Sequence, residues 1–248
     1  MSRPVRALAT LALVLLASPA LGYVLPGTVA VRRAAEKRAE LKLSAVEASG
    51  TLEAFGPLQG RLRGLGAAPG TPARLLVKVS HRARLELIPP GAGDADRPYA
   101  ALRDERLSGQ GGLEGTPAAA ALLRTLAAFQ GSAPGGDGRA LAEALIRRGV
   151  RLDETSLGRT GGRVAVVLGG KPGEPQPLAW LDKETFQPLR LQLDEGQARL
   201  DVRLLDWTSQ AGGAWFPRIV EVWEKDALLL RFTTEKASGN PKLADALF

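Results

Sequence analysis

The chain has 248 residues, with 33 lysines and arginines, 26 aspartates and glutamates, one histidine and no cysteine. The lack of cysteine excludes disulfides, thiolate nucleophiles and cysteine-ligated metal sites, so the hydrophobic core alone must hold the fold. A Ser-His-Asp triad would have to use His81, which lies in a basic segment where no acidic residue follows before Glu86. We therefore predict no catalytic residues, no metal site and no cofactor.

The first 22 residues have the pattern of a secretory signal. Arg3 and Arg6 precede an uncharged run from Ala7 to Ala17, and small residues follow up to Gly22. The apolar run is shorter than the roughly 20 residues that span a bilayer, which favours a cleaved signal over a retained anchor. We expect residues 23–248 to form one monomeric domain in the periplasm, without a lipid-modified N-terminal cysteine.

The first part of this domain is predicted to be a helix followed by strands. Apolar residues cover one face of residues 28–41, as in a helix packed on a sheet. Strand patterns follow at residues 43–55, 74–79 and 82–88, interrupted by a Gly/Pro-rich stretch at 64–72. Residues 91–115 are predicted to be mostly loop, with a short strand at 99–107.

A basic stretch lies within these strands. Between Phe55 and Leu85 there are six basic residues and no acidic one: Arg61, Arg63, Arg74, Lys78, Arg82 and Arg84. They could contact anionic lipid headgroups, or they could form the solvated face of a strand. Binding to nucleic acid is not expected, because no aromatic side chains alternate with these charges as a base-stacking surface requires.

Two helices are then predicted as an insertion near residues 116–149. Thr116 and Pro117 suit the N-cap and first turn of a helix over residues 118–129, which is almost uncharged and therefore needs cover on all sides. Residues 139–148 form an amphipathic helix that ends at Gly149.

From Arg163 to Thr233 the chain alternates in the manner of an antiparallel meander. Every second residue is apolar in segments 189–193, 200–204, 218–223 and 228–232, and turn residues separate the segments. The predicted fold class is therefore α+β, a curved antiparallel sheet with helices covering one face.

Three C-terminal segments carry a family pattern, namely residues 178–190 (LAWLDKETFQPLR), residues 215–219 (WFPRI) and the closing residues 240–248 (NPKLADALF). Together they resemble the periplasmic outer-membrane lipoprotein-sorting proteins of the LolA-like superfamily. The resemblance implies an incomplete barrel with a helical lid over a hydrophobic cavity, which holds lipid or lipoprotein acyl chains without a catalytic step.

On this interpretation the apolar residues of the meander line the cavity and the uncharged helix is its lid. The cavity residues would be Trp180, Leu189, Leu191, Leu193, Leu200, Val202, Leu204, Val220, Val222, Leu228, Leu230 and Phe232, and the lid residues Leu122, Leu123, Leu126 and Phe129. The alternative function is an envelope sensor or interaction module, in which the same scaffold has a filled core and binds a protein partner instead of a lipid.

Overall fold

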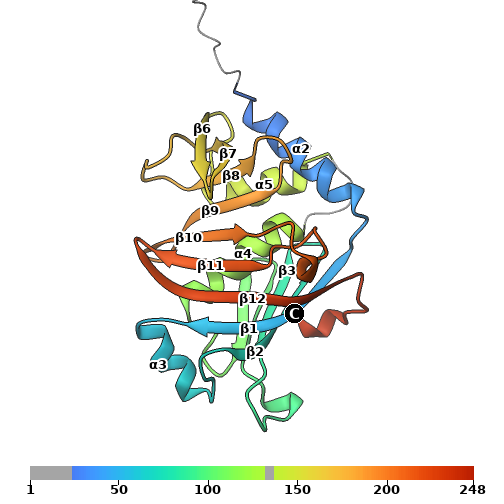
Figure 1. Cartoon of the computed structure of the whole chain (residues 1–248), viewed down its shortest axis with the longest axis vertical. Coiled ribbons are helices and arrows are strands. Elements are labelled where there is room, and N and C mark those ends of the chain that lie inside the picture. The colour runs from blue at the N-terminus through green and yellow to red at the C-terminus, as the bar shows by residue number, and fades with distance from the viewer. Residues whose placement is uncertain (1–23, 132–136) are drawn as a thin grey trace, which may run out of the picture.

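One antiparallel sheet contains every strand in the described part of the chain (Figure 1). The structure is a computed structural model that describes residues 24–131 and 137–248, so the predicted secretory signal lies outside the described residues. The strands are β1 (Ala45–Ala54), β2 (Thr71–Lys78), β3 (Arg82–Leu87), β4 (Tyr99–Arg103), β5 (Arg106–Gln110), β6 (Thr155–Thr160), β7 (Arg163–Leu168), β8 (Leu178–Asp182), β9 (Pro188–Glu195), β10 (Ala198–Leu205), β11 (Ile219–Glu224) and β12 (Ala227–Gly239).

The sheet consists of two meanders that meet at the middle of the sheet. Its strand order is β5-β4-β3-β2-β1-β12-β11-β10-β9-β8-β7-β6, so the first and last strands of the sequence pair with each other. Strands β1 and β12 pair over most of β1, from Val46 opposite Gly239 to Ala54 opposite Leu230. This long-range pairing makes one curved sheet out of two hairpin-connected halves.

The helix α4 (Pro117–Gln130) lies on the concave side of the sheet. It contacts strands of both halves, namely β2, β3 and β4 on one side and β9, β10 and β11 on the other. Thr116 caps it, because the Thr116 hydroxyl accepts a hydrogen bond from the Ala119 amide at 3.3 Å. Nearly all of its residues are buried, as a helix that is apolar all round requires. The predicted curved sheet with helices on its concave face is therefore confirmed.

Three further helices lie at the edges of this layer. They are α2 (Gly27–Glu40), α3 (Pro57–Gly64) and α5 (Arg139–Arg147). Helices α2 and α5 pack on each other at one end of the sheet, and α3 packs against β1. None of the helices in residues 24–131 and 137–248 is both long and apolar enough to cross a bilayer.

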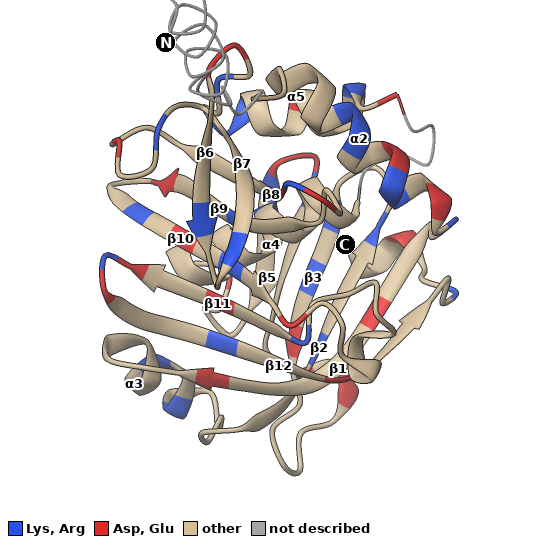
Figure 2. Ribbon diagram, turned by 45° about the horizontal axis from the view of Figure 1, so that its top comes forward, with Lys and Arg blue, Asp and Glu red and all other residues tan. Residues whose placement is uncertain are grey.

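The two faces of the sheet differ in chemistry, as alternation predicted. On the concave face Leu191, Val202, Val222 and Leu230 stand opposite one another across four neighbouring strands, and all four are fully buried. Charged residues of both signs lie along the strands (Figure 2), and on the convex face they pair with each other, for example Arg190 with Asp201 at 2.5 Å. The convex face is therefore a network of paired charges.

Several elements differ from the sequence predictions. Residues 57–64 form α3, residues 99–110 form a β-hairpin within the predicted loop, and β6 precedes the first predicted strand of the meander. These segments have short or weakly periodic patterns, which do not distinguish strand from turn.

Candidate functional site

The residues predicted to line a cavity are mostly in place on the concave face, but α4 covers them. The meander residues other than Leu228 and Trp180, and all four lid residues, are at most 5% exposed and belong to one continuous core. A side chain with no exposure has no water-sized space beside it. The central hollow of the sheet is therefore filled by α4 in this structure.

Two of the predicted cavity residues lie elsewhere. A β-bulge adds one residue to β12, so that Leu230 pairs with Val222 while Leu228 pairs with Trp223. Trp223 belongs to the convex face, where Arg203 stacks on its ring at 4.4 Å, and Leu228 shares that face. Because a bulge adds one residue to one strand, side chains on its two sides no longer follow a single alternation. Alternation alone therefore assigns Leu228 to the wrong face.

Trp180 also lies on the convex side. It pairs with Arg190, whose guanidinium lies 5.2 Å from the centre of the Trp180 ring. Strand β8 is buried at all five positions, so its sequence shows no alternation from which a face could be assigned.

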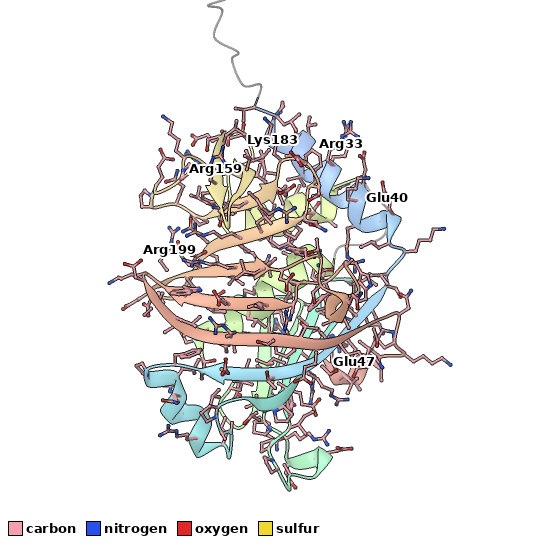
Figure 3. All side chains as sticks on the ribbon, in the orientation of Figure 1. Arg33, Glu40, Glu47, Arg159, Lys183 and Arg199 are labelled. Carbon is pink, nitrogen blue, oxygen red and sulfur yellow. The ribbon has the colours of Figure 1, made fainter. Side chains whose placement is uncertain are left out.

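An opening with mostly apolar walls lies at the end of α4, and we call it the end pocket. Its volume is about 420 Å³. Its walls come from α2, the last residues of α4, the start of α5, the turn between β8 and β9 and the connection between β10 and β11 (Figure 3, in which Glu40 marks the lining end of α2). The lining residues are Ala34, Lys37, Arg38, Glu40, Leu41, Phe129, Gln130, Leu141, Glu184, Thr185, Phe186, Gln187, Pro188, Trp207, Ala214 and Trp215.

The turn between β8 and β9 is a rigid wall of this pocket. The Asp182 carboxylate accepts hydrogen bonds from the Glu184 and Thr185 amides at 3.0 and 2.7 Å, and Arg163 lies 2.8 Å from its second oxygen. Burial alone would raise the pKa of Asp182, but these hydrogen bonds and the Arg163 charge lower it below its ordinary value. The ionised aspartate thus stabilises the turn, in which the Phe186 amide donates to the Asp182 backbone carbonyl at 3.0 Å and Phe186, with φ of 58°, lies at the pocket wall.

Two of the segments that carry the family resemblance meet at this pocket. Residues 184–188 belong to the first segment, and Trp215 belongs to the second. Trp207 also lines the pocket, and its indole NH donates to the Leu204 carbonyl at 3.1 Å. The alternation pattern predicted a site on the strands and not at this pocket. The signal that the sequence does contain is the Asp-x-x-Thr-Phe motif of the turn, residues 182–186.

A second, smaller apolar pocket lies at the opposite end of α4. Its volume is about 250 Å³, and Thr116, Pro117 and Ala118 of the first turn of α4 line it together with Leu200 and Leu229. The end pocket is lined by Phe129 and Gln130 from the last turn. Helix α4 therefore occupies the length of the concave side between two apolar openings.

Ion pairs hold α4 in this position. The Arg124 guanidinium donates to the Glu195 carboxylate of β9, and the Glu105 carbonyl accepts from it at 3.4 Å. Glu105, in the turn between β4 and β5, also lies 3.3 Å from the guanidinium of Arg148, which follows α5. The helical insertion is thus tied to both halves of the sheet.

The chain's own C-terminal segment covers part of the basic stretch. The Asp245 carboxylate lies 2.5 Å from the Lys78 ammonium and 2.7 Å from the Arg82 guanidinium, while Arg84 donates to the Leu247 carbonyl at 2.7 Å. Three of the six basic side chains are therefore engaged by residues 245–247. Arg61 and Arg63 lie on α3, away from this group.

The described residues hold no group of three or more histidine, aspartate or glutamate side chains that could bind a metal ion. His81 is half-buried, and its Nδ1 lies 3.1 Å from the Ala127 carbonyl of α4. Burial lowers the pKa of His81, so the ring is held neutral against α4. Its surroundings explain it as a packing residue.

No family model matches the chain, and no curated protein matches it. Several solved structures are similar in arrangement. A LolA superfamily protein from Nitrosomonas europaea is 11% identical with a TM-score of 0.47, covering 90% of this chain and 97% of its own. A putative outer membrane lipoprotein-sorting protein domain from Vibrio parahaemolyticus is 10% identical with a TM-score of 0.37, covering 86% and 93%.

MucB, solved in complex with MucA(peri), is 18% identical with a TM-score of 0.29, covering 90% of this chain and 60% of its own. Likenesses at these TM-scores assign neither a family nor a ligand to this chain.

Proposed function

We propose that this protein is a non-catalytic binding protein of the periplasm that holds an acyl chain of a lipid or lipoprotein beside α4. The observation that supports the proposal is the end pocket. A volume of about 420 Å³ lies within the range of small-molecule sites, and aromatic side chains form much of its wall. It opens next to the apolar concave face, where a chain could continue.

The proposal gives α4 the role of a lid. The end pocket alone can take one short chain, so a longer chain would replace part of α4 on the concave face. Lid residues Leu122, Leu123 and Leu126 and the strand residues beneath them would then contact the ligand. The pockets at both ends of α4 mark the two openings of that path.

The free energy gained by burying an acyl chain is similar in size to the free energy lost by uncovering the lid side chains. Burying a methylene group is worth about 0.8 kcal/mol, so ten of them contribute about 8 kcal/mol. Uncovering the four lid side chains would cost about 1.5–3 kcal/mol each by the same scale. Because these amounts nearly cancel, a closed state without ligand and an open state with ligand are both accessible, as a reversible carrier requires.

A protein-binding function is the second candidate. One observation favours it, namely that α4 fills the hollow, as expected for a scaffold that works through its surface. Ile146 of α5 is 57% exposed, an apolar side chain that a protein partner could cover. On this alternative the end pocket would be a packing defect at the junction of α2, α4 and α5.

Native mass spectrometry of the mature protein, with extraction and identification of bound lipid, distinguishes the two functions. The variant Ala34→Leu fills the end pocket from α2, and Ala39→Leu makes the same change on that helix at a residue that does not line the pocket. We expect one bound acyl lipid in the wild type and in Ala39→Leu, and little in Ala34→Leu. Absence of bound lipid and of measurable binding of added laurate or dodecanol would refute the carrier function.

A further inference from the structure

One charged side chain in the end pocket lacks the partners that comparable side chains have. Arg38, in the last turn of α2, is partly buried, and its Nη2 donates to the Gln130 carbonyl at the end of α4 at 2.8 Å. Its Nε and Nη1 are buried and have no hydrogen-bond partner among the described residues. The guanidinium therefore has two unused donors at the wall of an apolar pocket.

Several other arginines with partly buried head groups are matched by carboxylates. Arg190 donates to both oxygens of Asp201, at 2.5 and 2.7 Å, and Arg148 lies 3.3 Å from Glu105. No carboxylate in the described residues lies within ion-pair distance of Arg38, and the helix's own acids are used by exposed neighbours, as in the pair of Lys37 with Glu40 at 3.0 Å. Arg38 is thus an unneutralised cation.

The surroundings of Arg38 favour an anion. Burial lowers the pKa of Arg38 to about 10, and no nearby charge acts in the opposite direction. The side chain stays protonated at neutral pH, but its charge is poorly solvated. An oxyanion at Nε and Nη1 would restore the lost solvation and satisfy two donors with the fork geometry that arginine offers to carboxylates and phosphates.

The apolar part of the pocket defines the rest of the ligand. Phe129, Leu141 and Trp207 are at most 4% exposed and form its inner wall, while Trp215 and Phe186 are half-buried at its rim. The other charged lining residues are Lys37, Glu40 and Glu184. Of these, Lys37 and Glu40 neutralise each other. A hydrocarbon chain fits the wall, and its head group would lie at Arg38.

We infer that the end pocket is selective for a single-chain amphiphile with one compact oxyanion as its head, and that Arg38 is the residue that recognises this head. The inference rests on the proposed function and adds the class of ligand. Since Nε and Nη1 are closed to solvent here, the head reaches them when the side chain of Arg38 turns toward the pocket. The recognised group is a carboxylate or phosphate carried on a hydrocarbon chain, not a free anion.

The test compares three ligands. Laurate has both the hydrocarbon chain and the carboxylate head, dodecanol has the chain without the charge, and acetate has the carboxylate without the chain. Binding is followed by the fluorescence of the pocket tryptophans or by calorimetry. In the wild type we expect laurate to bind about tenfold more tightly than dodecanol, the effect of one charge-assisted hydrogen bond, and acetate not to bind measurably. Dodecyl phosphate should bind like laurate.

Two variants test whether Arg38 causes the preference for laurate over dodecanol. Arg38→Met should weaken laurate binding about tenfold and leave dodecanol binding within about twofold, because only the head loses its partner. Lys37→Met removes the same charge from the same turn of α2 and should change laurate binding by less than about twofold, because Lys37 is already paired. Circular dichroism and a thermal melt check that both variants are folded.

Equal binding of laurate and dodecanol by the wild type would overturn the inference and leave acyl-chain binding intact. Unchanged laurate affinity in folded Arg38→Met, or acetate binding as tight as laurate binding, would also overturn it. Failure of both laurate and dodecanol to bind would remove the proposed function itself. If Arg38→Met does not fold, the comparison of laurate with dodecanol in the wild type still tests whether the pocket selects an anionic head group.

Discussion

Replacement of Arg124 by methionine should strongly destabilise the protein, because it leaves a buried carboxylate without a partner. Glu195 of β9 is 8% exposed at its side chain. One of its oxygens accepts from Arg124, while the other is buried and has no partner among residues 24–131 and 137–248. Arg124 in turn has a second acceptor, the Glu105 carbonyl at 3.4 Å. The pair is therefore asymmetric, since Glu195 depends on Arg124 more than Arg124 depends on Glu195.

This asymmetry sets the expected magnitudes. Leaving a buried charge unpaired costs about 3–5 kcal/mol, so Arg124→Met should lower the free energy of unfolding by about that amount. Glu195→Gln keeps a neutral acceptor for Arg124 and should cost about 1 kcal/mol. In the double variant Arg124→Met, Glu195→Met no charge is left unpaired, so it should be more stable than Arg124→Met alone.

Urea unfolding followed by circular dichroism and tryptophan fluorescence measures these differences. Linear extrapolation gives the free energy of unfolding, and an unchanged slope shows that the same surface is exposed in each variant. Arg139→Met serves as control, because Arg139 pairs with Glu143 of its own helix at 2.9 Å on the surface. It should cost less than about 1 kcal/mol.

A cost below about 1 kcal/mol for Arg124→Met would refute this reasoning. It would mean that Glu195 reaches water or another donor when Arg124 is absent, and that the pair does not hold α4 to β9. A double variant less stable than Arg124→Met would likewise show that Glu195 stabilises the protein by itself.

Three further predictions concern the sheet, the C-terminal segment and the histidine. Gly50→Ala should cost more than about 2 kcal/mol in urea unfolding, because the new Cβ would lie 1.9 Å from a β12 carbonyl oxygen, whereas Gly60→Ala in α3 meets nothing within 4 Å and should stabilise by about 0.5–1 kcal/mol; similar costs for both would contradict the close approach of β1 and β12. Hydrogen bonds from Lys78 and a neighbouring arginine lower the pKa of Asp245 to about 2, so this contact stabilises the fold above the ordinary aspartate pKa and is lost as pH falls toward 2. A carboxyl titration by NMR should show a higher Asp245 pKa in Lys78→Met, and an unchanged value would contradict the pairing. Burial lowers the pKa of His81, so the unfolded chain takes up a proton first as pH falls through about 6.5, and the wild type should lose stability between pH 7 and 5 relative to His81→Asn; parallel stability curves would refute this.

Local patterns in the sequence were sufficient for the elements that depend on them. The almost uncharged run between Thr116 and Gly131 indicated a helix buried on all sides, and nearly all residues of α4 are buried. Alternation in residues 189–204 placed Leu191 and Val202 on one face, and both are fully buried beneath α4. These predictions hold because helix and strand periods act over a few residues and need no knowledge of distant partners.

The candidate site could not be found in that way. The end pocket joins residues from 34 to 215 in the chain, and alternation says which side chains share a face but not what covers that face. Trp180 and Leu228 illustrate this, since Trp180 lies in a strand without alternation and Leu228 lies beside a bulge in the pairing of β11 with β12.

The sequence by itself thus determined the antiparallel meander, the buried helix and the absence of disulfides and thiolate chemistry, because residue identity and local periodicity are enough for those. Only the tertiary structure decided that α4 fills the concave side, that apolar openings remain at its two ends, and that Arg38 faces one of them without a carboxylate. Those features depend on how side-chain volumes and charges from distant segments meet in space, which no local pattern encodes.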